Sequence, residues 1–248
     1  MEIQLIILLY HRISDDLEPG DLIVPVEKFR EQMEFLKRNC QVISLEQFLL
    51  GHHVTKSPVT SKTRVIITFD DGYRDNYLNA YPILKKLGLP AIIFLITSMI
   101  GTDKKRERYK HLPSPDMLSW QEVDEMAENG ILFASHTHRH PHLLELSSQQ
   151  QRDEIEESIA TLGHKVTMTV RKPPRRGQSH KFAFAYPYGE YNQDTLKILK
   201  ELEIEYAFTV EPKINTSQTN PLELGRIGIH GLDTIEDFRK KCEGKCGK

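Results

Sequence analysis

Residues 64–72 read RVIITFDDG, an apolar run that ends in two aspartates and a glycine. The run predicts a β-strand buried on both faces, because parallel strands covered by helices are almost continuously apolar. In parallel α/β folds, ligands and catalytic groups gather at the carboxyl ends of the strands. Asp70 and Asp71 are therefore candidate site residues, since one carboxylate can bind a metal while the other accepts a proton. The alternative is structural, with Asp capping the helix that follows.

Apolar runs and amphipathic segments alternate along the rest of the chain. Further strands are expected at residues 3–10, 91–97, 131–135, 182–186, 206–210 and 226–229, and helices at residues 27–38, 44–51, 75–87, 119–130, 148–162, 192–202 and 234–242. About seven β/α units predict a parallel sheet with helices outside, either a closed barrel or a doubly wound sheet. We expect one domain over residues 1–248, because α/β barrels commonly reach about 250 residues.

The composition is that of an ordinary globular protein. Of 248 residues 27% are charged, and 33 basic against 35 acidic side chains leave a net charge of −2. Such a balance gives no field that would attract nucleic acid, so no nucleic-acid partner is expected. Cys40, Cys242 and Cys246 are too few for a disulfide scaffold and fit a reducing compartment. A disulfide or metal site at Cys242 and Cys246 is not favoured.

The first ten residues, MEIQLIILLY, are apolar enough to suggest a signal peptide. They lack a basic segment and a small-residue cleavage site, so we expect a β-strand that the mature protein keeps. No stretch approaches the ~18–20 apolar residues that span a bilayer, so no transmembrane segment is expected. A cytoplasmic location follows as the expectation, and the pattern does not specify an oligomeric state.

Residues 135–142 read SHTHRHPH and follow another expected strand. This density of histidine indicates a metal site, since histidine is the commonest metal ligand near neutral pH. Two histidines and an aspartate from another strand would leave open positions for water and substrate, as catalytic zinc sites do. Helical spacing pairs His136 with His140, or His138 with His142, strand-like spacing gives other pairs, and spacing alone does not choose among them. The alternative is a structural histidine cluster without metal.

A third element, FAFAYPYG at residues 182–189, runs from an expected strand into a turn. The three elements together resemble the polysaccharide deacetylases that share the NodB homology domain, carbohydrate esterase family 4. TFDDG at residues 68–72 matches the first motif of that family, and HTHRH at residues 136–140 matches the second, H-[ST]-x-x-H. AYPYG at residues 185–189 is similar to the third, RxPY. The resemblance covers most of the chain.

The resemblance implies a distorted (β/α)7 barrel of the NodB type and removal of N-acetyl groups from an N-acetylhexosamine-containing polysaccharide or glycan. It implies that one divalent metal ion is held by Asp71, His136 and His140, and that Asp70 is the general base. Zinc is the expected metal, with cobalt and nickel as alternatives. The carbonyl oxygen would lie near the backbone N–H of Tyr188, in the turn that Pro187 begins.

Two departures from the common pattern affect the remaining roles. Ala185 stands where the third motif has an arginine that orients the catalytic aspartate, and Arg226 is a candidate replacement. YHRI at residues 10–13 is similar to the N-terminal YHxI element of the biofilm poly-N-acetylglucosamine deacetylases, which implies that His11 is the general acid. His230 is the competing candidate. MLSW at residues 117–120 is similar to another element of that subgroup, with Trp120 either a wall of the sugar site or part of the core.

Other functions remain open at this level. The basic segments 103–111 and 164–181 are either solvated loops or contacts for an anionic ligand. A deacetylase of a small or lipid-linked cytoplasmic sugar precursor is one alternative to a polysaccharide enzyme. The other is a catalytically inactive carbohydrate-binding member of the fold, which the intact aspartates and histidines disfavour.

Overall fold

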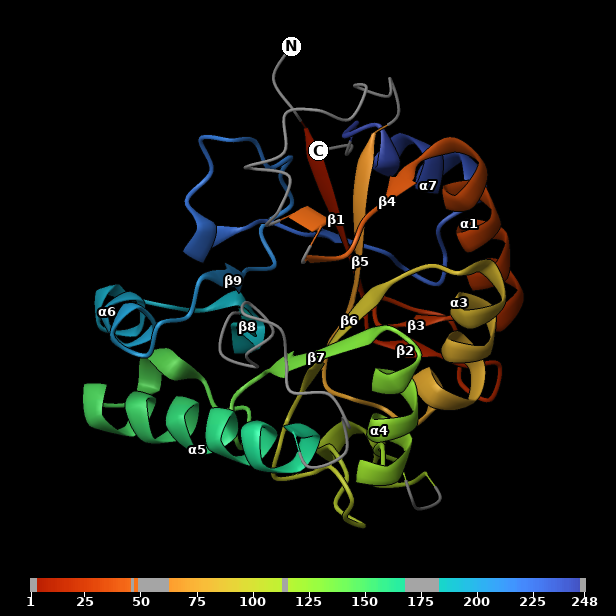
Figure 1. Cartoon of the computed structure of the whole chain (residues 1–248). Helices are drawn as coiled ribbons and strands as arrows, with labels where there is room; N and C mark the ends of the chain where they lie inside the picture. Colours follow the sequence, from red (N-terminus) through yellow and green to blue (C-terminus); the bar gives the residue numbers. More distant parts are fainter. Residues whose placement is uncertain (1–3, 46, 49–62, 113–115, 168–182, 246–248) are drawn as a thin grey trace.

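The computed structural model describes residues 4–45, 47–48, 63–112, 116–167 and 183–245 (Figure 1). The expected helix end at Gly51, Cys246 and most of the basic segment 164–181 lie outside these ranges. One curved sheet contains strands in the order β10 (Ile227–Gly228), β1 (Leu5–Tyr10), β5 (Arg64–Phe69), β6 (Ala91–Leu95), β7 (Ile131–Ser135), β8 (Ala183–Ala185) and β9 (Tyr206–Phe208). A further strand, β4 (Gln41–Val42), also pairs with β5, and every pair in this sheet is parallel.

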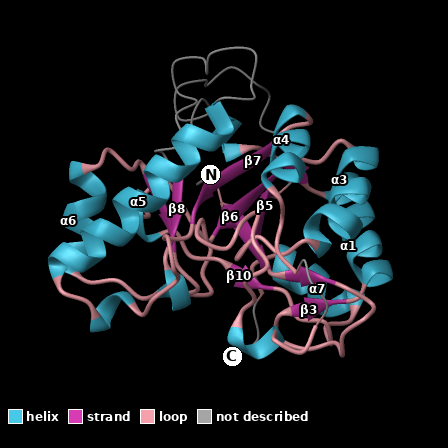
Figure 2. Ribbon diagram, turned by 90° about the horizontal axis from the view of Figure 1, so that it is seen from below, coloured by secondary structure: helices cyan, strands magenta, loops and turns pink. Residues whose placement is uncertain are grey.

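Helices surround the sheet on its outside, as Figure 2 shows. They are α1 (Val26–Asn39), α3 (Tyr81–Leu87), α4 (Trp120–Glu128), α5 (Ser148–Thr167), α6 (Gln193–Glu201) and α7 (Ile235–Cys242). Short turns of helix lie between them: η1 (Asn76–Ala80), η2 (Glu107–Tyr109), η3 (Leu143–Glu145), η4 (Pro187–Gly189) and η5 (Pro221–Glu223). The expected distorted (β/α)7 barrel is confirmed.

The sheet curls without a ladder between β9 and β10 among the described residues. The segment before β10 lies against the end of β9 instead. Thr209 N donates to Leu224 O at 2.8 Å, and Arg226 N donates to Glu211 O at 3.0 Å. This seam places residue 226 inside the barrel wall, where its side chain is fully buried.

The register of β1 against β5 positions the site. All six residues of β1 are buried, and the pairing runs from Leu5 beside Arg64 to Tyr10 beside Phe69. The residues that follow, His11 and Asp70, therefore leave the sheet at the same edge. The apolar N-terminal run forms a strand, as expected, which begins at Leu5 and lies between β10 and β5.

Several expected helix boundaries are confirmed by their caps. Ser119 accepts from Glu122 N and Glu122 accepts from Ser119 N, which is the expected capping box at the start of α4. Ser44 and Gln47 exchange the same pair of hydrogen bonds. Helix α3 ends at Gly88, whose φ of 62° is the left-handed conformation that glycine adopts without strain.

The expected helix at residues 75–87 is not one continuous α-helix. Its first part, η1, is a π-helical turn, and α-helical geometry begins at Tyr81. Pro82 explains the change, because a proline has no N–H to donate and its ring clashes with the carbonyl four residues earlier. Three short strands were also not expected. One is β4, and the others are β2 (Arg12–Ile13) and β3 (Ile23–Val24), which pair with each other.

The described part of the chain contains no helix that combines the length and apolar character needed to cross a membrane.

Candidate metal centre and active site

Asp70 and Asp71 leave β5 in a tight turn. Asp70 N donates to Tyr10 O at 3.0 Å, one step beyond the paired residues of the strands. The chain then turns through Asp71 and Gly72, with φ of 75° and 83°. The left-handed φ of Gly72 favours glycine, and an added Cβ would lie 2.7 Å from Leu95 Cδ2, so that side chain would have to shift. Both aspartates are buried, which places two adjacent carboxylates at the carboxyl edge of the sheet.

His136 and His140 come from the loop that follows β7. Thr137 and His140 have φ of 65° and 62°, uncommon for residues with a side chain and costly unless the surroundings hold them. Thr137 Oγ1 accepts from His140 N at 2.9 Å and stabilises this bend. The bend brings the two imidazole rings together, with centroids 4.6 Å apart.

Asp71, His136 and His140 form a buried triad that fits a metal ion. Asp71 Oδ1 lies 3.6 Å from His136 Nε2 and 3.5 Å from His140 Nε2, and one ligand atom from each residue lies within 4.8 Å of the others. Asp71 Oδ1 is buried and has no hydrogen-bond partner among the described residues. Such an unpaired buried carboxylate oxygen is costly without a cation. Two imidazoles and one carboxylate are a donor set of catalytic zinc sites.

The protonation of the triad also suits a cation. His136 Nδ1 lies 2.8 Å from Ala185 O, and because a carbonyl only accepts, that nitrogen carries the proton and Nε2 presents its lone pair. Burial and the neighbouring His136 lower the pKa of His140 to about 3, so its ring is neutral. Burial alone would raise the pKa of Asp71, but nearby His140 and His11 favour its charged form and hold the pKa well below its usual range.

Asp70 is paired with Arg226 rather than with the triad. Arg226 Nη1 and Nη2 donate to Asp70 Oδ1 and Oδ2, each at 2.7 Å, and Nε donates to Thr209 O at 2.9 Å. Burial works to raise the pKa of Asp70, but Arg226 together with the nearby His136 and His11 outweighs it and keeps that pKa lowered. Asp70 Oδ2 lies 3.8 Å from His136 Nε2, so this oriented carboxylate stands beside the triad.

Two more groups lie next to these residues. His11 is half-buried, and burial lowers the pKa of its ring overall, although nearby Asp70 and Asp71 act to raise it. The ring of Tyr188 lies 4.6 Å from that of His140 and stacks on His142 at 3.8 Å. Tyr188 has a positive φ of 58°, in the turn that buried Pro187 begins.

Asp70, Asp71 and both histidines of the triad fall within the part of the chain that matches one protein family. The sequence profile of polysaccharide deacetylases matches residues 57–207, more than half of the chain. The chain belongs to the polysaccharide deacetylase family. The match includes TFDDG and the histidine loop, so the resemblance noted in the sequence is confirmed.

Related polysaccharide deacetylases align over most of the chain. It is 34% identical over 227 residues to YxkH of Bacillus subtilis (strain 168), which is named for the same family; the alignment spans 90% of this chain and 70% of that protein. It is 32% identical over 233 residues to the poly-beta-1,6-N-acetyl-D-glucosamine N-deacetylase of Staphylococcus aureus (strain N315), over 93% of this chain and 76% of that protein.

Solved deacetylase structures share the fold. The Streptococcus pyogenes deacetylase PplD, in complex with acetate, superposes with a TM-score of 0.77 and 26% identity, over 98% of this chain and 99% of that one. IcaB from Ammonifex degensii superposes with a TM-score of 0.75 over 98% of both chains. Its identity of 23% supports likeness of fold alone.

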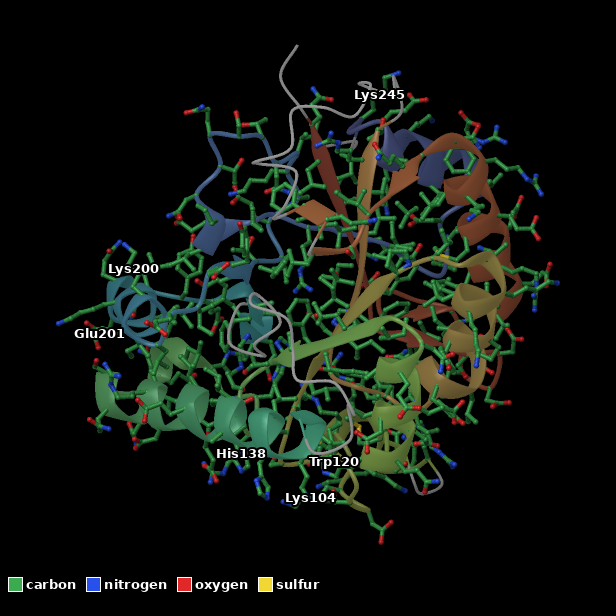
Figure 3. The ribbon with its side chains drawn as sticks, in the orientation of Figure 1. Lys104, Trp120, His138, Lys200, Glu201 and Lys245 are labelled. Atoms are coloured by element: carbon green, nitrogen blue, oxygen red, sulfur yellow. The ribbon has the colours of Figure 1, made fainter. Side chains whose placement is uncertain are left out.

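The remaining candidates make contacts with residues other than the triad. Trp120 starts α4 and packs on Gly101, where an added Cβ would lie 2.9 Å from the indole. In Figure 3, Trp120 and His138 appear along the lower part of the molecule. His138 Nε2 lies 3.2 Å from Oε1 of Glu157, a residue of α5, so the His138 side chain faces that helix. His230 Nδ1 lies 3.4 Å from Asp21 Oδ1.

One site residue was missed by sequence reasoning. Arg106 interacts electrostatically with Asp71 and with Tyr188. The sequence marked its segment, residues 103–111, as basic, but no pattern distinguished this arginine from its neighbours. Through Arg106, the basic segment 103–111 contributes a positive charge near the carboxylate of Asp71.

Proposed function

We propose that this polysaccharide deacetylase is a metal-dependent hydrolase that removes N-acetyl groups from an N-acetylhexosamine-containing polysaccharide. The observation that carries the proposal is the buried triad of Asp71, His136 and His140 beside a carboxylate, Asp70, that a buried arginine orients. The naming of a relative as a poly-beta-1,6-N-acetyl-D-glucosamine N-deacetylase supports the substrate class. Acetate, present in the PplD structure, is the product that such a reaction releases.

Asp71, His136 and His140 would hold one divalent ion, for which we propose zinc, with cobalt or nickel as alternatives. When bound, such an ion lowers the pKa of water toward ~7 and polarises the amide carbonyl. His136 is prepared for this role because Ala185 O fixes its tautomer. His140 is prepared because it is neutral at the pH where the enzyme would work.

The chain supplies the proton transfers. Asp70, kept ionised and oriented by Arg226, would accept the proton that the attacking water gives up. The leaving amine must be protonated, and we assign this to His11. Its coupling to both Asp70 and Asp71 supports His11 over His230, whose ring contacts Asp21 instead.

The neighbourhood of the carbonyl oxygen is assigned from the third motif. We propose that the backbone N–H of Tyr188 donates to this oxygen as negative charge develops on it. The contact between the rings of Tyr188 and His140 supports this assignment, since it keeps residue 188 beside the triad. A role for Trp120 as a wall of the sugar site, a single domain over residues 1–248 and a cytoplasmic location stay predictions.

We expect the metal to be lost when a triad residue is changed. Wild type, reconstituted with zinc and dialysed, should retain one ion per chain by elemental analysis. Asp71→Ala and His136→Ala should retain essentially none, because each removes one of three protein ligands. His142→Ala is the matched control: it belongs to the same loop but contacts Glu190, so it should bind metal normally. Full occupancy in both triad variants would contradict the proposed centre.

A further inference from the structure

The segment that carries His11 is held by side chains from the turn after β5. Asn76 Nδ2 donates to His11 O at 2.8 Å. Ile13 N donates to Asp75 Oδ1 at 3.1 Å, and Asn79 Nδ2 donates to Ile13 O at 2.8 Å. Three side chains of one short segment therefore fix the backbone of residues 11–13, and only Asn76 contacts His11 itself.

The orientation of Asn76 is determined by its partners. Its side-chain nitrogen also donates to Asp75 Oδ1 at 3.1 Å, and a carbonyl and a carboxylate both only accept, so this end of the amide is the NH₂ group. Asn76 is 1% exposed, so water cannot readily replace the hydrogen bond to His11 O. The contact is a buried, directed one.

Asp75 is in turn immobilised by Arg12, the neighbour of His11. Arg12 Nε donates to Asp75 Oδ2 at 2.6 Å, and Arg12 Nη2 donates to Asp116 Oδ1 at 2.5 Å. The guanidinium packs against the rings of Tyr73 and Tyr109, which are nearly perpendicular to each other, 4.4 and 4.5 Å from their centroids. Packed against the tyrosines and paired with two carboxylates, Arg12 holds Asp75 in place, and Asp75 in turn accepts a hydrogen bond from Asn76.

Asn76, which donates to His11 O, is the first residue of the π-helical turn η1. Such turns widen the helix and often occur at functional sites. Here the turn presents Asp75, Asn76 and Asn79 to the same stretch of chain, residues 11–13. The base Asp70 lies six residues before Asn76, so one continuous segment carries the base and reaches the backbone of the acid.

We propose that Asn76 is a positioning residue that fixes the place of His11 relative to the leaving amine. This inference rests on the proposed function, in which His11 is the general acid. A displaced acid protonates a leaving group poorly, and a shift of about 1 Å can cost about 10²-fold in rate. The role is therefore needed for an amide, whose amine must be protonated, and not for an ester whose leaving group departs as an anion.

The test compares two substrates across four proteins. Acetate release is measured from N-acetylglucosamine oligomers and from 4-nitrophenyl acetate, whose phenolate needs no proton to leave. The proteins are wild type, His11→Ala, Asn76→Ala and the control Asn79→Ala, which removes a hydrogen bond of the same kind to Ile13 O. Zinc content and thermal unfolding are measured for each, and Asn76→Ser is used if Asn76→Ala does not fold.

We expect His11→Ala to lose roughly 10²–10⁴-fold in kcat on the amide and to keep its ester activity. Asn76→Ala should lose roughly 10–10²-fold on the amide alone, with KM and zinc content unchanged. Asn79→Ala should show no amide-selective loss, whatever its stability.

Three results would overturn the inference, and they are distinguishable. Equal losses on both substrates in Asn76→Ala, or no loss, would show that Asn76 has only a structural role or none. An amide-selective loss in Asn76→Ala but not in His11→Ala would show that Asn76 does not act through His11. A zinc-loaded wild type inactive on both substrates would overturn the proposed function itself, and the inference with it.

Discussion

Asp70→Asn is expected to lower kcat for acetate release from an N-acetylglucosamine oligomer by roughly 10²–10⁴-fold, because an amide cannot accept the proton of the attacking water. Asparagine has the size of aspartate, and its oxygen still accepts from one of the two Arg226 nitrogens, so the backbone and the triad should stay in place. KM and zinc content should therefore change little. Steady-state kinetics with elemental analysis of the same sample measure both.

The matched control is Asp237→Asn, which makes the same chemical change in an exposed capping box at the start of α7. It should leave kcat near the wild-type value. An Asp70→Asn enzyme with near wild-type kcat and normal zinc would rule out Asp70 as the base. A variant that has lost its zinc would instead show that Asp70 helps to hold the ion.

Arg226→Met should cause the largest loss of stability among the changes considered. The guanidinium is fully buried and donates to both oxygens of Asp70, so its removal leaves a buried carboxylate without its partner. Breaking a buried pair in this way costs roughly 3–5 kcal/mol. For a chain of this size that corresponds to a fall in Tm of roughly 6–20 °C. Thermal unfolding followed by circular dichroism measures the effect.

The control for Arg226→Met is the same substitution at an exposed arginine, Arg38. Arg38 pairs with Glu34 on the surface of α1, and its side chain is 73% exposed, so Arg38→Met should shift Tm only slightly. Arg226→Lys keeps the charge but cannot form two parallel hydrogen bonds, and its Tm should fall between those of wild type and Arg226→Met. Equal Tm values for Arg226→Met and Arg38→Met would contradict the orienting role of Arg226.

The sequence predicts those parts of the fold that local physics determines. The strands β1 and β5 could be recognised because a parallel strand that is buried on both faces is an almost continuous run of apolar residues. The start of α4 could be recognised because Ser119 and Glu122 satisfy the first free N–H groups of the helix. Strands β2 and β3 have two residues each, too few to show any periodicity.

In the candidate site too, the sequence could indicate individual residues but not the contacts between distant parts of the chain. His136 and His140 could be singled out only with the family resemblance, since spacing alone also allowed His138 and His142. Arg226 was a candidate because an arginine was missing at residue 185, yet its pairing with Asp70 spans 156 residues of sequence. That contact depends on how the sheet curls and where its seam lies.

The positioning contacts were not predictable from sequence. The hydrogen bond from Asn76 to His11 depends on a π-helical turn that the helical periodicity of residues 75–87 does not reveal. Arg106 reaches Asp71 from a segment whose basic composition is shared by many solvated loops. Such contacts arise from tertiary packing and become visible only in the folded chain.

The central claim is most directly tested by acetate release from β-1,6-linked N-acetylglucosamine oligomers. One preparation is assayed as zinc-loaded protein, after chelation verified by elemental analysis, and after zinc is restored. We predict acetate in equal amount to new free amines, lost on chelation and recovered with zinc. Release that continues undiminished in the verified metal-free protein would contradict the account, as would a zinc-loaded protein that releases no acetate from polymeric, small or lipid-linked N-acetylated sugars.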